Sequence, residues 1–188
     1  MSQWRRILGL PQPRPAVPVV DAHEAPDLEA TMPAFVGGRP LVTWSVAGDG
    51  FWKVMGKADA RSILGAELEA AGVSASAIEM AVAGRADTHH DPPYILFGLR
   101  FGDIRAVDLP QAATAVAMDV ASIDANRGEN WFDATVAGRK VLVGNREMVQ
   151  QDRHHRGLPY VYRSARTMYT VVADDESWAE EVIGKLPA

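Results

Sequence analysis

The chain contains no cysteine among its 188 residues. This absence excludes disulfide bonds, thiolate nucleophiles and metal sites built on cysteine. There is also no apolar run near the roughly 20 residues that a membrane-spanning helix needs. The formal net charge is -5, so the whole chain lacks the positive field typical of nucleic-acid binding. No serine lies in a nucleophile elbow and no glycine pair lies in a phosphate-binding loop, so we expect no catalytic residues and no nucleotide cofactor.

What is present is the composition of an ordinary globular protein. Hydrophobic residues make up 47% and charged residues 23% of the chain. On folding, a chain of this length buries roughly 70% of the surface that is accessible in the unfolded chain, and it forms a core without disulfide bonds or a structural metal ion. The N-terminus has two arginines but neither a long apolar region nor a small-residue cleavage site, so we expect a cytoplasmic protein.

Prolines concentrate near the N-terminus and predict a tail over residues 1–31, followed by a single domain over 32–188. The start of the tail has apolar residues on one side of a short helix and arginines on the other. Such a segment suits docking on a protein partner or a membrane surface, and the alternative is a terminus that packs on its own domain. The candidate partner-binding residues are Trp4, Arg5, Arg6, Ile7 and Leu8.

The domain reads as alternating strands and helices. Segments rich in β-branched and aromatic residues predict strands at 35–36, 41–46, 78–83, 94–101, 131–136, 140–143, 160–163 and 167–172. Helical spacing of apolar residues predicts helices at 59–71 and 108–123 and a final one that begins at Asp174 or Asp175. The predicted fold is α+β, with two related hairpin-plus-helix halves at about 32–125 and 126–188 forming a mostly antiparallel sheet with helices on one face.

Two pairs of segments suggest that the halves are a repeat. Residues 35–42 and 135–142 both read strand, glycine turn, arginine, strand. Residues 87–94 and 152–160 both contain an aspartate, a histidine pair and then Pro-Tyr before a strand. The alternative is that such short matches recur by composition alone.

Residues from about 30 to 187 resemble a group of uncharacterised bacterial proteins, many of them exported. The shared features are a V-x-G-R/K-x-V hairpin, a strand beginning with Pro-Tyr, a strand like residues 168–176, and a terminal amphipathic helix ending in Leu-Pro. The resemblance implies a two-half α+β fold and no activity. The proline-rich N-terminus departs from the group, because it stands where an export signal or a lipid-attachment cysteine is expected.

Histidine forms the most unusual grouping in the chain, because four of the five histidines fall in two adjacent pairs. Imidazole is a common ligand of zinc, copper and nickel, so a divalent metal such as zinc is the cofactor to consider. Adjacent histidines on a strand point to opposite faces, so one from each pair would reach a shared ion. The alternative is that these are solvated loop residues. The candidate metal ligands are His89, His90, His154 and His155.

Arginine and tyrosine alternate in the last third of the chain, a pattern that suits either an anionic partner or an ordinary solvated sheet face. Nearby acidic residues dilute the charge, so we expect no nucleic acid. By elimination, the sequence predicts a noncatalytic binding or structural module that engages a protein partner or a second copy of itself. The alternative is a metal-binding protein or metal-dependent enzyme that uses the histidine pairs.

Overall fold

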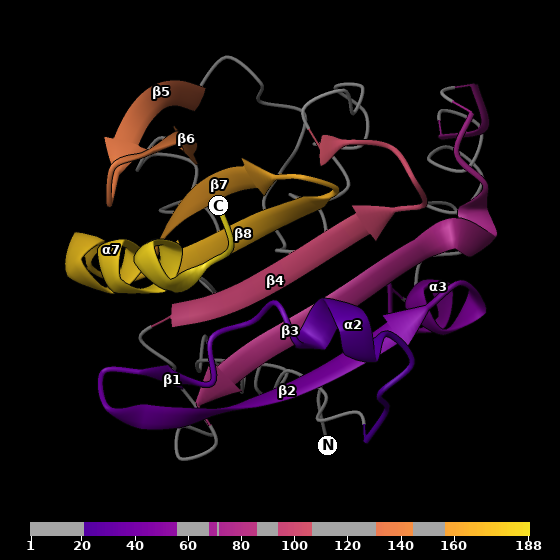
Figure 1. Ribbon diagram of the computed structural model, residues 1–188, viewed down its shortest axis with the longest axis horizontal. Coiled ribbons are helices and arrows are strands. Elements are labelled where there is room, and N and C mark those ends of the chain that lie inside the picture. The colour runs from indigo at the N-terminus through magenta and orange to yellow at the C-terminus, as the bar shows by residue number, and fades with distance from the viewer. Residues whose placement is uncertain (1–20, 56–67, 71, 86–93, 107–130, 145–156) are drawn as a thin grey trace, which may run out of the picture.

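In the computed structural model, which describes residues 21–55, 68–70, 72–85, 94–106, 131–144 and 157–188, the chain forms one eight-stranded sheet (Figure 1). The strands are β1 Phe35–Val36, β2 Arg39–Ala47, β3 Ile78–Arg85, β4 Tyr94–Phe101, β5 Trp131–Val136, β6 Arg139–Gly144, β7 Leu158–Ser164 and β8 Thr167–Ala173. The α-helices with defined bounds are α2 Pro26–Glu29, α3 Asp49–Met55 and α7 Glu176–Lys185, and a short 3₁₀ turn covers Ala75–Ala77. The predicted mostly antiparallel α+β architecture is confirmed.

The strand order is β1-β2-β3-β4-β8-β7-β6-β5, and every neighbouring pair is antiparallel. The central pair is β4 with β8, where Tyr94 lies opposite Ala173 and Arg100 opposite Thr167. Strands β1, β2 and β3 lie on the β4 side of this pair, and β7, β6 and β5 lie on the β8 side. β2 and β5 are therefore the outermost long strands of the sheet.

Both faces of the sheet are buried, because the central strands carry apolar residues at successive positions. On β3, Val82 belongs to one apolar cluster and its neighbour Ala83 to the other. Phe51 and Trp52 of α3 pack on the face of Val82, whereas Leu28 of α2 and the buried side of α7 pack on the face of Ala83. The prediction that all helices lie on one face is therefore wrong, because each apolar face needs its own cover.

The final helix, α7, begins where the sequence predicted. The side chain of Asp175 accepts a hydrogen bond of 2.8 Å from the backbone N–H of Ser177, which caps the helix. Hydrogen bonds from the side chain and the backbone of Ser177 lower the pKa of Asp175. The buried residues of α7 are Ala179, Val182 and Ile183, at the spacing of one helical face.

The β1–β2 hairpin contacts α7 through its turn. The backbone N–H of Gly37 donates to Oε1 of Glu181 at 2.8 Å, and Nζ of Lys185 donates to the carbonyl of Phe35 at 2.9 Å. Hydrogen bonds from Lys185 and from the Gly37 backbone lower the pKa of Glu181. The turn is thus held by a charged pair on the helix.

The β5–β6 hairpin, at the opposite side of the sheet, contacts the same helix and the residues that follow it. The guanidinium of Arg139 donates to the carbonyl of Pro187 at 2.8 Å and to that of Gly184 at 3.3 Å. The same guanidinium lies 5.0 Å from the ring centroid of Tyr162. The sheet is therefore curved, and its two outer hairpins meet one helix, which Figure 1 shows lying between them.

The two hairpin turns share an uncommon backbone geometry. Gly37 and Gly38 have φ of 60° and 69°, and Ala137 and Gly138 have φ of 51° and 74°. Two successive residues with positive φ make the turn that matches the twist of an antiparallel hairpin. Glycine adopts this region at little steric cost, whereas the Cβ of Ala137 strains it.

Two predicted helices fall mainly or wholly outside the described residues. Of the helix predicted at 59–71, only residues 68–70 are described, and they are helical. The helix predicted at 108–123 lies outside them. In the described part of the chain, no helix has the length and apolar character to cross a membrane.

Candidate protein-binding edge

The residues that the sequence proposed for a site lie outside the part of the chain that the structure describes. This holds for the histidine pairs His89, His90, His154 and His155 and for the N-terminal segment Trp4, Arg5, Arg6, Ile7 and Leu8. The remaining histidine, His23, is described, and its Nδ1 contacts Oε2 of Glu29 at 2.9 Å. Within the described ranges, no group of three histidine, aspartate or glutamate residues is placed to hold a metal ion.

The tyrosines of the last third are not available for stacking on a nucleic acid. Tyr160, Tyr162 and Tyr169 are all buried, on the face that α7 covers. The rings of Tyr162 and Tyr169 lie 6.2 Å apart and stack on each other, and the hydroxyl of Tyr162 donates to the carbonyl of Pro187 at 3.0 Å. Burial lowers the pKa of the neighbouring Arg163 guanidinium, which is half-buried. The three tyrosines belong to the core.

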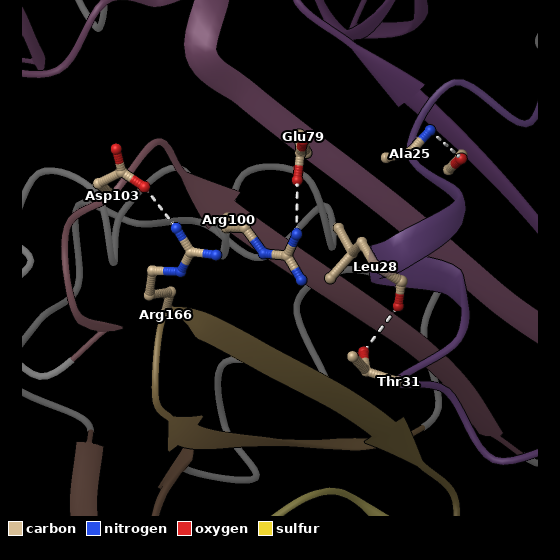
Figure 2. A network of polar contacts seen from close by, with 8 residues as sticks. Ala25, Leu28, Thr31, Glu79, Arg100, Asp103 and Arg166 are labelled. Atoms are coloured by element: carbon tan, nitrogen blue, oxygen red, sulfur yellow. Dashed lines mark hydrogen bonds and ion pairs between the residues drawn. The ribbon is translucent and has the colours of Figure 1, made fainter.

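A row of polar residues crosses the sheet on the face that α2 and α7 cover. Glu79, Arg100, Thr167 and Ser164 are register partners on β3, β4, β8 and β7. Nη1 of Arg100 donates to Oε2 of Glu79 at 3.0 Å. Beyond the row, Arg166 pairs with Asp103 (Figure 2).

Each of these two arginines therefore has a carboxylate partner, as Figure 2 shows. The positive charges of Arg100 and Arg166 are balanced within the pairs. An anion would have to displace Glu79 or Asp103 to bind there. The pairing allows the charged side chains of this row to lie on a largely buried face. These two arginines therefore do not form a free cationic site.

The outer edge of β2 is covered by the chain's own N-terminal arm, residues 22–34. Antiparallel strands point alternate backbone N–H groups outward, and on β2 these include Leu41, Ser45 and Ala47. The N–H of Leu41 donates to the carbonyl of Ala34 at 2.9 Å, and that of Ser45 donates to the carbonyl of Ala22 at 2.8 Å. Part of the segment that the sequence assigns to the tail thus lies against the sheet.

The same arm satisfies further groups of this edge. Residue His23 forms a parallel bridge with Ser45, whose carbonyl accepts a hydrogen bond of 3.2 Å from the N–H of Glu24. The N–H of Ala47 donates to Oε2 of Glu24 at 2.8 Å. Leu28 of α2, which follows, is fully buried. Additional strands cannot pair with this part of β2 unless the arm leaves it.

The outer edge of β5 differs, because within the described residues no strand or arm pairs with it. β5 and β6 are joined by the turn at Ala137 and Gly138, with Val136 opposite Arg139. The residues that flank a two-residue turn, here Val136 and Arg139, exchange backbone hydrogen bonds. Every second residue back from Val136, that is Ala134 and Phe132, therefore also directs its backbone hydrogen bonds toward β6. Trp131, Asp133 and Thr135 consequently direct their backbone N–H and C=O groups outward.

The exposed large apolar side chains also lie on the outer strands. Among the described residues these are Phe35 on β1, Val42 on β2 and Phe132 on β5, exposed by 57%, 45% and 52%. Phe132 lies on the same side of its strand as Val136. Val136 is buried in the α7 cluster, Ala134 is partly buried, and Phe132 is exposed. Burial of this face of β5 against the α7 cluster therefore decreases from Val136 toward Trp131, and Phe132 lies outside it.

Sequence reasoning located both hairpins but not this edge. Which strand is outermost depends on pairings between residues far apart in the chain, and the sequence contains no local signal for them. The available signal was the composition of residues 131–136, in which an aspartate and a threonine alternate with apolar residues. Such alternation is typical of a strand with one covered face.

No family model, no curated protein and no solved structure gives a significant match to the chain. The resemblance to the bacterial two-half group therefore stays a prediction. The architecture assigns the chain to the α+β class with a mostly antiparallel sheet.

Proposed function

We propose that the protein is a noncatalytic module that engages a protein partner by adding a strand to the outer edge of β5. The observation that carries the proposal is the difference between the two edges. On the β2 edge, the outward N–H groups of Leu41, Ser45 and Ala47 are bonded to the arm. The β5 edge instead presents the outward groups of Trp131, Asp133 and Thr135 next to exposed Phe132. An extended segment would bond to these groups and place an apolar side chain against Phe132.

The chemistry of this edge suits binding and not catalysis. Asp133 is the one ionisable residue of β5, and no histidine or second carboxylate lies on the strand. Strand addition gains affinity from backbone hydrogen bonds and specificity from alternate side chains. Phe132 supplies the apolar contact, and its neighbours on the opposite side, Asp133 and Thr135, are exposed.

The test begins with selection of binders from a library of displayed random peptides against the full chain. The affinities of the selected peptides are then measured for the wild type, Phe132→Lys and Phe35→Lys. We expect Phe132→Lys to weaken binding about tenfold or more, because a charged side chain on an edge opposes strand addition. Phe35→Lys is the matched control, since Phe35 is as exposed but lies on β1, at the opposite side of the sheet.

Backbone hydrogen exchange locates the bound peptide independently of the substitutions. Amide protons of Trp131, Asp133 and Thr135 should exchange more slowly in the complex, because pairing shields them from water. Peptides that bind Phe132→Lys as tightly as the wild type contradict the proposal. So does protection that is confined to strands other than β5.

We further propose that the two halves of the chain arose by duplication. The mirrored strand order about β4 and β8 supports this, as do the positive-φ turns at 37–38 and 137–138, each followed by an arginine. The Pro-Tyr correspondence does not add support. It equates the start of β4 with the start of β7, and these strands occupy different positions counted from the centre of the sheet.

A further inference from the structure

We infer that the strand received by the β5 edge is β5 of a second copy, so that two chains pair antiparallel about a two-fold axis with Phe132 opposite Phe132. This inference rests on the proposed use of the β5 edge and names its occupant. Three features of the described residues carry it: the difference between the edges, the positions of the charges on β5, and the exposure of Phe132.

The difference between the edges determines what kind of assembly can form. A chain with two open edges would pair β5 of one copy with β2 of the next and continue into a filament. Here the arm bonds to Leu41, Ser45 and Ala47 on β2, so head-to-tail pairing is blocked along the covered part of that strand. Pairing of β5 with β5 uses the same edge twice, and the assembly closes as a dimer.

The charges on β5 select among the possible registers. Outward-facing residues must pair with outward-facing residues, so the axis can pass through Asp133 or through a neighbouring residue. An axis through Asp133 would place two carboxylates directly opposite each other, which is unfavourable. An axis through Phe132 places each Trp131 opposite Asp133 of the second copy and removes this repulsion. An axis through Ala134 would also remove it, because Asp133 would then lie opposite Thr135, so the choice between these two registers depends on Phe132.

An axis through Phe132 also makes the best use of the exposed aromatic residue. In this register the two Phe132 residues form a pair without hydrogen bonds, the kind in which opposing side chains approach most closely. Aromatic side chains opposite each other stabilise antiparallel strands. Phe132 is 52% exposed in the single chain, so its burial against a copy of itself removes apolar surface from water.

An interface formed by one strand pair is small compared with most permanent dimers, so the association depends on protein concentration. Sedimentation velocity of the full chain, at concentrations from about 1 to 200 µM, should show a species of twice the 20.4 kDa of one chain growing with concentration. Phe132→Lys should weaken this association about tenfold or more, and Phe35→Lys should leave it unchanged. Circular dichroism of both variants checks that they are folded.

Because the chain has no cysteine, single cysteine variants report the register directly. With oxidised glutathione as the oxidant, Phe132→Cys should form a disulfide-linked dimer, because residues opposite each other in such a pair have Cβ atoms close enough to bridge. Two variants should remain largely monomeric under the same conditions: Ala134→Cys, two residues along the same face, and Phe35→Cys, on β1 at the opposite side of the sheet.

The outcomes separate this inference from the proposed function. A chain that stays monomeric at all concentrations overturns the inference, and so does a dimer that Phe132→Lys leaves intact or that links better through position 134 than through 132. In each of these cases peptides that bind at β5 would still support the proposed function. Loss of the dimer in Phe132→Lys together with linkage at position 132 supports the inference.

Discussion

The backbone N–H of Gly37 and Oε1 of Glu181, 144 positions apart in the chain, form a hydrogen bond of 2.8 Å. Oε1 of Glu181 also accepts a hydrogen bond from Nζ of Lys185, and these donors hold the pKa of Glu181 below its ordinary value of 4.5. A carboxyl whose pKa is lowered by folding contributes stability above the unfolded pKa. That stability is lost as the pH falls through the folded pKa.

We therefore predict that the melting temperature falls less steeply between about pH 6 and pH 3 in Glu181→Gln than in the wild type. Thermal unfolding followed by circular dichroism at several pH values measures the difference. Glu180→Gln, an exposed neighbour, is the control and should retain the wild-type dependence. Identical pH profiles of the wild type and Glu181→Gln would show that the contact with Gly37 contributes no pH-dependent stability.

A methyl group at Gly98 should loosen the contact between α2 and the sheet. A Cβ at this position would lie 2.5 Å from Cε of Met32 and 3.5 Å from Cδ1 of Leu28. Because Cε is the free end of a flexible side chain, we expect Gly98→Ala to reduce the free energy of unfolding by only up to about 1 kcal/mol, and Met32→Ala to recover part of that loss in the double variant. Denaturant unfolding measures both.

Gly84→Ala is the matched control for this prediction. Gly84 lies in β3, and a Cβ there would meet nothing within 4 Å. Since glycine weakens the interior of a strand, alanine should be neutral or stabilising by up to about 1 kcal/mol. Equal destabilisation by both substitutions would mean that the close approach of Met32 is not the cause.

The turn between β7 and β8 offers a stabilising substitution. Ala165 is exposed and has φ of 46°, a region in which its Cβ is strained. Ala165→Gly should raise the free energy of unfolding by up to about 1 kcal/mol, because glycine enters this region freely. Ala30→Gly, at an exposed residue with φ of -62°, should instead be neutral or destabilising. A stabilising effect of both would contradict the explanation by backbone strain.

The histidine pairs are tested by elemental analysis of untagged protein purified without chelators. If they bind a metal, zinc, copper or nickel should be present at nearly one equivalent and should be lost in the His89→Ala, His154→Ala double variant. A metal-free wild type, with the variant folded as before, would remove this alternative and leave the protein-binding function.

The strands could be predicted from the sequence because their signals are local. The turns at 37–38 and 137–138 contain glycine, the segments beside them are rich in β-branched and aromatic residues, and Asp175 precedes an amphipathic helix. All eight strands and α7 lie where these signals placed them, within a few residues.

Features set by distant contacts could not be predicted in the same way. Residues 22–25 of the arm contain no strand signal of their own. They lie beside β2 because the backbone and the hydroxyl of Ser45 form hydrogen bonds with the arm backbone, and because the carboxylate of Glu24 accepts one from the N–H of Ala47. α2 and α3 are short, and their positions depend on burial of Leu28 and Phe51. Successive apolar residues on the central strands indicate burial of both sheet faces in the sequence itself. Which helix covers which face becomes evident only once the strand order is known.

Contact of both outer hairpins with α7 has a consequence for the kinetics of folding. The hairpins β5–β6 and β7–β8 join residues that are neighbours in sequence, so they can form in microseconds. The bond between Gly37 and Glu181 requires the closure of a loop that contains most of the chain, and such long-range closure is slow. We expect the sheet to pair from within each half first, and docking of α7 between the two hairpins to be the late, rate-limiting step that commits the chain to its native form.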